Sequence, residues 1–132
     1  PTPLHVFQGE LTKNHLFSFC TRSIHHLRLS PDATPDTPPF PCKIRMLGVA
    51  TYNVLTIASG LCIGGIEATP KVWDIAATWV ICQAAGATWH SLKQSPFPLK
   101  AGEQYHSASY PCLVLGNGAW QAQFLDLFAP EV

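Results

Sequence analysis

Charged residues are scarce in this sequence of 132 residues. Lys and Arg together number eight, Asp and Glu also number eight, and the formal net charge is zero. Neither sign forms a run, whereas a protein that neutralises nucleic-acid phosphates needs clustered Lys and Arg. The scarcity argues against nucleic acid as the main partner and against attachment to an acidic membrane surface. With 47% hydrophobic and 12% charged residues, the chain is expected to rest part of its surface against another polypeptide.

Long hydrophobic runs and paired cysteine motifs are also missing. The longest apolar tract, residues 47–66, is interrupted by polar residues and glycines, so it does not predict a membrane-spanning helix. The five cysteines include no C-x-x-C pair, which disfavours a zinc site or a thioredoxin-type site. We therefore expect free thiols in a reducing compartment, and a cytoplasmic protein.

Short apolar strands alternate with helices along the rest of the chain. This alternation indicates a single α/β domain over residues 1–132, with a mixed sheet and helices packed on it. Five prolines within residues 31–41 predict a loop, because neither a helix nor a central strand tolerates them. Strands are predicted over 4–8, 15–20, 43–48, 61–67, 87–92 and 112–117, helices over 49–60, 69–86 and 118–128, and a long polar loop over 93–110.

The helix predicted over 69–86 carries a single carboxylate, Asp74, in its first turn. Its other residues are apolar on every face, which predicts a helix buried on both sides, as between two sheets. A carboxylate in such surroundings costs free energy unless it is compensated. Three kinds of compensation remain open: hydrogen bonds from the helix N-terminus, an ion pair, or a divalent cation.

Two stretches resemble motifs of the inositol monophosphatase family. "PKVWDIAATWVICQAAGA" (70–87) is similar to its W-D-x-A-A signature, and "RMLGVATYNVLTIASG" (45–60) is similar to its R-x-x-G-[ST]-A-A turn. The spacing of seven residues from Glu67 to Asp74 resembles that of members which accept inositol phosphate. The resemblance covers residues 15–128 and implies the layered α/β/α/β/α sugar-phosphatase fold, with this chain as its C-terminal lobe.

The resemblance also implies roles for individual residues. Asp74 would be a ligand of Mg²⁺, while Glu67 and the backbone at Ala50 would contact substrate hydroxyls. Lys71 lies where a positive charge could hold a phosphate or a sugar hydroxyl. The substrate-binding candidates are Glu67, Ala50, Lys71, Gly48 and Cys20.

The remaining metal ligands of that family, an E-E pair and a D-P-x-D-G-T motif, are absent from this sequence. The chain opens with Pro-Thr-Pro in the middle of an apolar pattern, so we expect an N-terminal metal-binding lobe to be missing from it. The implied function is part of a Mg²⁺-dependent phosphatase for a small phosphorylated polyol, inositol monophosphate first. Sister substrates are a sugar bisphosphate or a nucleotide 3′-phosphate. The other class of function is a non-catalytic lobe that folds and associates, with the missing lobe or with copies of itself.

Overall fold

The computed structural model describes residues 1–26 and 40–128 of the chain. Within it, five strands form one sheet in the order β2-β1-β3-β5-β4. The sheet is mixed, because β1 is parallel to both of its neighbours and β5 is antiparallel to both of its own. The strands are β1 (Leu16–Phe19), β2 (Lys43–Arg45), β3 (Gly64–Glu67), β4 (Thr88–Ser91) and β5 (Cys112–Leu115).

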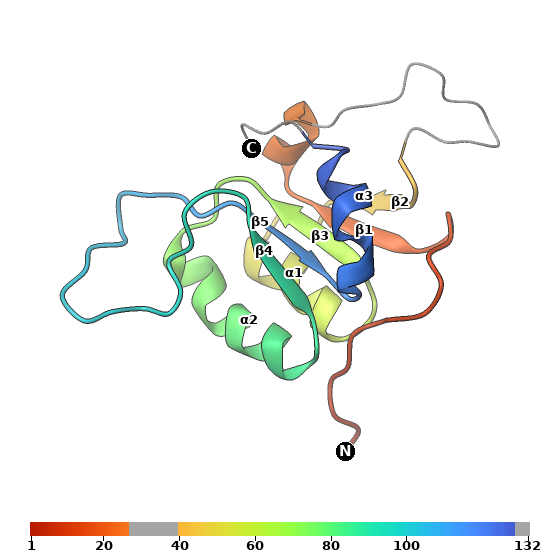
Figure 1. Cartoon of the computed structure of the whole chain (residues 1–132), viewed down its shortest axis with the longest axis horizontal. Coiled ribbons are helices and arrows are strands. Elements are labelled where there is room, and N and C mark those ends of the chain that lie inside the picture. The colour runs from red at the N-terminus through yellow and green to blue at the C-terminus, as the bar shows by residue number, and fades with distance from the viewer. Residues whose placement is uncertain (27–39, 129–132) are drawn as a thin grey trace.

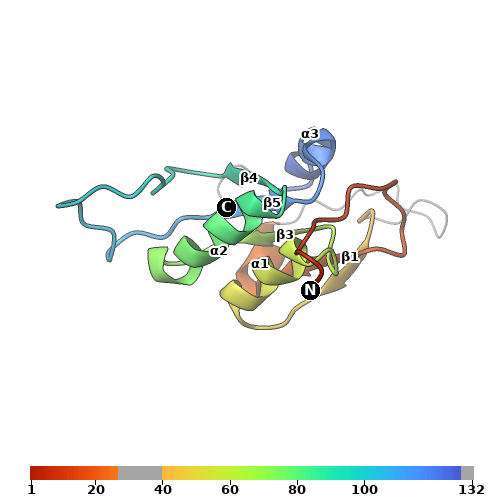
Figure 2. The same cartoon turned by 90° about the horizontal axis from the view of Figure 1, so that it is seen from below.

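Helices cover both faces of this sheet. The helices α1 (Ala50–Ala58) and α2 (Val72–Ala84) lie together on one face, and α3 (Gln121–Leu125) lies on the opposite face (Figure 1, Figure 2). Two 3-10 turns complete the described part: η1 (Thr21–His26) follows β1, and η2 (Gly118–Trp120) leads into α3. The predicted α/β class with a mixed sheet is confirmed. No helix among the described residues is long and apolar enough to cross a membrane.

Two separate cores follow from the alternation of side chains along the strands. The core toward α3 is dominated by aromatic rings, including Phe17, Phe19 and Phe124. The core toward α1 and α2 is built from smaller side chains, including Val54, Ile57 and Val114. The strand β5 shows the alternation, because Leu113 and Leu115 belong to the aromatic core, whereas Cys112 and Val114 belong to the other.

Glycines let α1 approach the sheet and follow the ends of α1 and α2. A Cβ atom on Gly65 would meet the Ser18 hydroxyl and the Ile57 side chain, so the absence of a side chain there lets α1 approach β3 closely. Gly60 and Gly86 have φ angles of +77° and +90°, in the left-handed region that follows many helix ends. The helix ends predicted near these two glycines are confirmed.

Two sequence predictions are wrong in this part of the chain. Residues 4–8 form no strand; instead the Val6 N–H donates to the Ala85 carbonyl at 3.2 Å, and the Val6 side chain is buried in the core under α1 and α2. The helix α2 is not buried on both sides either, since Trp73 and Val80 are 63% and 58% exposed. Apolar residues on every face of a helix show that all of its faces can be buried. They do not show which faces the rest of this chain buries.

The predicted proline-rich loop lies outside the described residues, apart from Phe40 and Pro41. The predicted terminal helix over 118–128 is shorter than expected, because η2 and a five-residue α3 replace it. The long polar connection between β4 and β5 contains no helix or strand, as predicted, and extends away from the body of the molecule (Figure 1).

Candidate functional site

A cavity of about 240 Å³ opens at the carboxyl ends of β1 and β3. These two strands are parallel, so their carboxyl ends meet at one edge of the sheet, where ligands of α/β proteins bind. Glu67 is the last residue of β3, Ala50 is the first residue of α1, and Asp74 stands in the first turn of α2. The lining residues are Cys20, Thr21, Arg22, Gly48, Ala50, Asn53, Glu67, Thr69, Pro70 and Asp74.

Most of the predicted site residues share this cavity. Asp74, Glu67, Ala50, Gly48 and Cys20 come from four separate stretches of the chain and all line it.

Lys71 is the exception among the predicted residues, because it does not line the cavity. Its Nζ donates to the carbonyl oxygens of Ala108 at 3.1 Å and of Ser107 at 3.4 Å. In this arrangement Lys71 ties the connection between β4 and β5 to the start of α2. The cation that does line the cavity is Arg22, on η1.

Asp74 is compensated at the helix N-terminus. Its Oδ2 accepts a hydrogen bond of 2.8 Å from the Lys71 N–H, and this bond satisfies one of the free donors of the first turn. The Asp74 carbonyl accepts from the Thr51 hydroxyl at 2.8 Å, which links α2 to α1. Oδ1 receives no hydrogen bond within residues 1–26 and 40–128, so this oxygen remains available to a ligand in the cavity.

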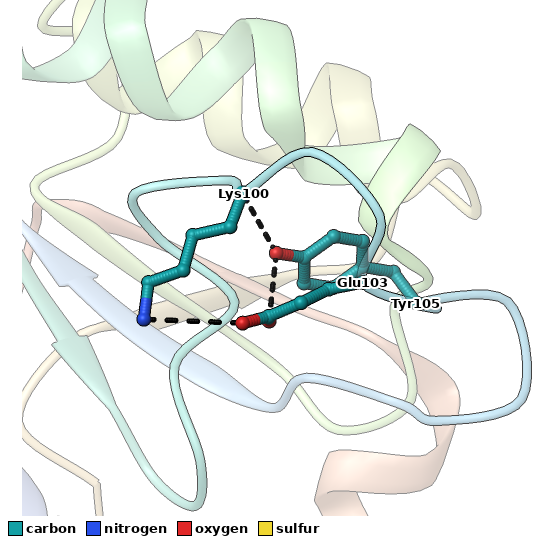
Figure 3. A network of polar contacts seen from close by, with 3 residues as sticks. All are labelled: Lys100, Glu103 and Tyr105. Atoms are coloured by element: carbon teal, nitrogen blue, oxygen red, sulfur yellow. Dashed lines mark hydrogen bonds and ion pairs between the residues drawn. The ribbon is translucent and has the colours of Figure 1, made fainter.

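No ion pair involves Asp74 among the described residues. The ion pair found there joins Lys100 Nζ to Glu103 Oε1 at 3.8 Å, in the connection between β4 and β5 (Figure 3). The Tyr105 hydroxyl donates to Glu103 Oε2 at 3.0 Å and accepts from the Lys100 N–H at 2.8 Å (Figure 3). This network shapes the extended connection and contains none of the residues that line the cavity.

Glu67 is a buried carboxylate with only 4% of its surface exposed. Its Oε1 accepts a hydrogen bond of 2.7 Å from the Asn53 side-chain amide. Burial raises the pKa of the Glu67 carboxyl above its ordinary value; hydrogen bonds from Asn53 and Cys20 oppose the rise, and the neighbouring charge of Asp74 adds to it. The site therefore holds two carboxylates in different surroundings, one buried and one at a helix terminus.

The cysteines are free thiols, as predicted. Cys20 lies 2.9 Å from the Ser23 hydroxyl, and its sulfur accepts a hydrogen bond of 3.2 Å from the Ala68 N–H beside Glu67. Burial raises the pKa of Cys42 to about 12 and that of Cys82 to about 11, which keeps both thiols protonated and unreactive. Cys20 is the thiol that lines the cavity.

Asn53 and Arg22 line the cavity but were not among the predicted site residues. A signal for Asn53 exists in the sequence: it is a lone amide in a mostly apolar helix, three residues after Ala50 and so on the same side of the helix. Arg22 carries no comparable signal, because a single arginine in a polar stretch is the usual composition of a protein surface.

The residues that the structure describes supply only part of a site for Mg²⁺. Among the described residues no group of three or more His, Cys, Asp or Glu side chains could hold a metal ion. Mg²⁺ requires an octahedral set of oxygen ligands, and it commonly takes one or two of them from protein carboxylates and the rest from water and phosphate. Asp74, with Oδ1 unengaged by the described residues, fits one position of such a set.

Comparison with models of protein families shows the family of the chain. The model of the inositol monophosphatase family matches residues 3–127, which is nearly the whole chain. The chain belongs to the inositol monophosphatase family. A search of curated proteins finds no match.

Solved structures with the inositol monophosphatase fold resemble this chain. SuhB from Mycobacterium tuberculosis superposes with a TM-score of 0.63 at 16% identity, covering 94% of this chain and 44% of that one. Inositol monophosphatase from Anabaena superposes with a TM-score of 0.62 at 18% identity, covering 97% and 49%. The staphylococcal IMPase-II bound to inositol monophosphate gives 0.64 at 15% identity, covering 96% and 47%. This chain therefore spans less than half the length of these three inositol monophosphatase-like structures.

Proposed function

We propose that this chain is the C-terminal lobe of a Mg²⁺-dependent phosphatase that hydrolyses a small phosphorylated polyol, with inositol monophosphate as the first substrate to test. The observation that carries the proposal is the single cavity shared by Glu67, Asp74 and the Gly48–Ala50 turn, in a chain of the inositol monophosphatase family. One structural relative was solved with inositol monophosphate and the same protein with 2′-AMP, which supports a phosphate monoester as the ligand class.

The residues that line the cavity have different proposed roles, which follow from their chemistry. Asp74 would hold the metal through Oδ1, because Oδ2 already caps α2. Mg²⁺, when bound, would polarise the phosphate and lower the pKa of a coordinated water. Glu67 and the backbone of the Gly48–Ala50 turn would receive and orient the hydroxyls of the polyol, with Cys20 beside them. Arg22 provides positive charge at the cavity, whereas Lys71 is directed toward the carbonyls of residues 107 and 108.

The uncovered side of α1 and α2 supports the proposal of a missing N-terminal lobe. Trp73 and Val80 on α2, and Val49 and Tyr52 at the start of α1, are each 56% exposed or more. Exposed large apolar side chains on two neighbouring helices are typical of a surface that another polypeptide covers. A lobe seated there would border the cavity, because Gly48, Ala50 and Asp74 belong to the same helix ends. Five free cysteines are consistent with a cytoplasmic location for the whole protein, which we propose.

A non-catalytic lobe that folds and associates is the second candidate. The observation that favours it is the incomplete set of metal ligands among the described residues. The intact mass of the protein in its source cells separates the two candidates. A mass near twice the 14.4 kDa of this chain would support the enzyme, whereas a mass near 14.4 kDa would support the associating lobe.

The direct test of the enzyme is phosphate release from inositol monophosphate by the intact native protein, measured over a range of Mg²⁺ concentrations. Asp74→Asn is expected to abolish activation by Mg²⁺, because an amide oxygen is a weaker cation ligand than a carboxylate. Asp126→Asn is the matched control, since Asp126 is exposed at the end of α3, outside the cavity. Unchanged Mg²⁺ activation in Asp74→Asn would contradict the proposed metal site.

A further inference from the structure

Asn53 occupies a constrained position in the first turn of α1. Its side chain is 1% exposed and lines the cavity. The backbone around it is fully engaged: its N–H donates to the Val49 carbonyl at 2.9 Å, and its carbonyl accepts from the Thr56 hydroxyl at 2.6 Å and the Ser18 hydroxyl at 3.4 Å. The side-chain amide is therefore held on a backbone that cannot shift to suit it.

The orientation of this amide follows from its neighbour. An ionised carboxylate can only accept hydrogen bonds, so the Nδ2 edge of Asn53 must face Glu67, where it donates over 2.7 Å. The Oδ1 atom is then turned away from Glu67. It is buried and has no hydrogen-bond partner among the described residues.

A buried carbonyl oxygen without a donor is uncommon in folded proteins, because losing its bond to water costs about 1–3 kcal/mol. Its presence in the residue that also lines the ligand cavity calls for a donor from outside the chain. Asn53 and Glu67 both line the cavity, and each side chain carries an acceptor oxygen. This pairing favours a ligand rich in hydroxyl groups over one rich in carbonyl groups.

We propose that Asn53 is a specificity-determining residue whose Oδ1 accepts a hydrogen bond from one hydroxyl of the phosphorylated polyol, next to the hydroxyl received by Glu67. This inference rests on the proposed function and adds a ligand contact to it. Nδ2 donates to Glu67 and holds it in place, while Oδ1 accepts from the ligand, so the two ends of one amide have separate roles.

The test is the binding of inositol monophosphate and of its single-deoxy analogues, each lacking one ring hydroxyl, to the intact native protein by calorimetry. Asn53→Leu has nearly the same size but neither polar atom. It is expected to weaken binding of inositol monophosphate by about 10-fold to 100-fold, the range for a hydrogen bond to a buried group. One deoxy analogue lacks the hydroxyl that donates to Oδ1. For this analogue, Asn53→Leu is expected to weaken binding by a much smaller factor.

A second variant keeps the test valid if Asn53→Leu does not fold. The exchange Asn53→Asp with Glu67→Gln conserves net charge and the hydrogen bond between the two side chains, with donor and acceptor reversed. It keeps an acceptor at position 53, so the wild-type preference for the hydroxyl read by that position is expected to persist. Asn14→Leu, which changes an exposed asparagine outside the cavity, is the control and is expected to bind every analogue as the wild type does.

Three results would overturn the inference in distinguishable ways. If Asn53→Leu weakens all deoxy analogues by the same factor as the parent, Asn53 acts only by holding Glu67 or a bound water. If the variant with Asn53→Asp and Glu67→Gln loses the preference for the hydroxyl assigned to Oδ1, the residue at position 53 does not bind that hydroxyl. If the wild-type protein binds no phosphorylated polyol, the proposed function fails and this inference fails with it.

Discussion

The two faces of the sheet differ in chemistry although they share the same five strands. The face toward α3 is packed with aromatic rings: Phe17 stacks on Phe124 with ring centroids 4.8 Å apart and meets Phe40 edge-on at 5.2 Å. The face toward α1 and α2 contains several buried polar residues, namely Ser18, Asn53, Thr56, Glu67 and Thr78. The aromatic face therefore packs apolar rings against one another, whereas the other face buries polar groups, two of which, Asn53 and Glu67, line the cavity.

This division explains how the site is supported. Buried polar groups cost free energy, and the Glu67 carboxylate adds to that cost by its desolvation. The aromatic core on the opposite face provides apolar burial that offsets it. The strands connect the two, because alternate residues of β1 and β3 point into each face.

The largest expected effect comes from breaking the aromatic face. Phe17→Ala removes a ring that contacts Phe19, Phe40 and Phe124, and leaves a cavity among rigid neighbours. We expect the free energy of unfolding to fall by about 3–5 kcal/mol, measured by urea denaturation. Leu61→Ala, at an exposed position, is the control and should change it by no more than about 0.5 kcal/mol. A similar small change in Phe17→Ala would mean that this face is not the main source of stability.

The pH dependence of stability tests the polar face. The folded state holds the pKa of Glu67 above its ordinary value of 4.5, so the folded chain binds a proton more tightly than the unfolded chain. The contribution of Glu67 to stability is therefore fully present below the unfolded-state pKa and is lost as pH rises through the folded-state pKa. Glu67→Gln is expected to remove this loss, making the variant more stable than the wild type on the alkaline side.

The measurement is urea denaturation of the wild type and of Glu67→Gln at a series of pH values from acid to mildly alkaline. Glu103→Gln, at a residue that is about half exposed, is the matched control and should keep the wild-type dependence on pH. Identical pH profiles for the wild type and Glu67→Gln would show that burial does not raise the pKa of Glu67 in the folded chain.

The smallest effect on stability is expected on the outer surface of α2. Trp73→Ser replaces a side chain that is 63% exposed, so the free energy of unfolding of the chain should change by no more than about 0.5 kcal/mol. Binding of a hydrophobic dye should fall, because the proposed lobe-binding face loses its largest apolar group. Leu61→Ser, at another exposed apolar residue, should affect the dye less. Unchanged dye binding in Trp73→Ser would contradict the assignment of this face.

Much of the fold and of the site could be predicted from the sequence because the signals involved are local. Alternation of apolar residues located the five strands of the sheet, and glycines marked the ends of α1 and α2. The motifs around Gly48 and Asp74 begin the helices α1 and α2, and Gly48, Ala50 and Asp74 from these motifs line the same cavity. The strand predicted at residues 4–8 failed because its apolar pattern serves the packing of Val6 against the end of α2 rather than sheet pairing.

The sequence by itself determined the order of the elements and the candidates Glu67, Asp74, Ala50, Gly48 and Cys20. Only the tertiary structure decided the partners of their side chains. Lys71 turns to the carbonyls of a distant connection, and Asn53 reaches Glu67 from another element. Which side of α2 is covered was likewise decided by the packing of α1 and the sheet against it. The physical reason is that a residue's periodicity depends on its near neighbours along the chain, whereas hydrogen bonds and burial depend on which surfaces the fold brings into contact.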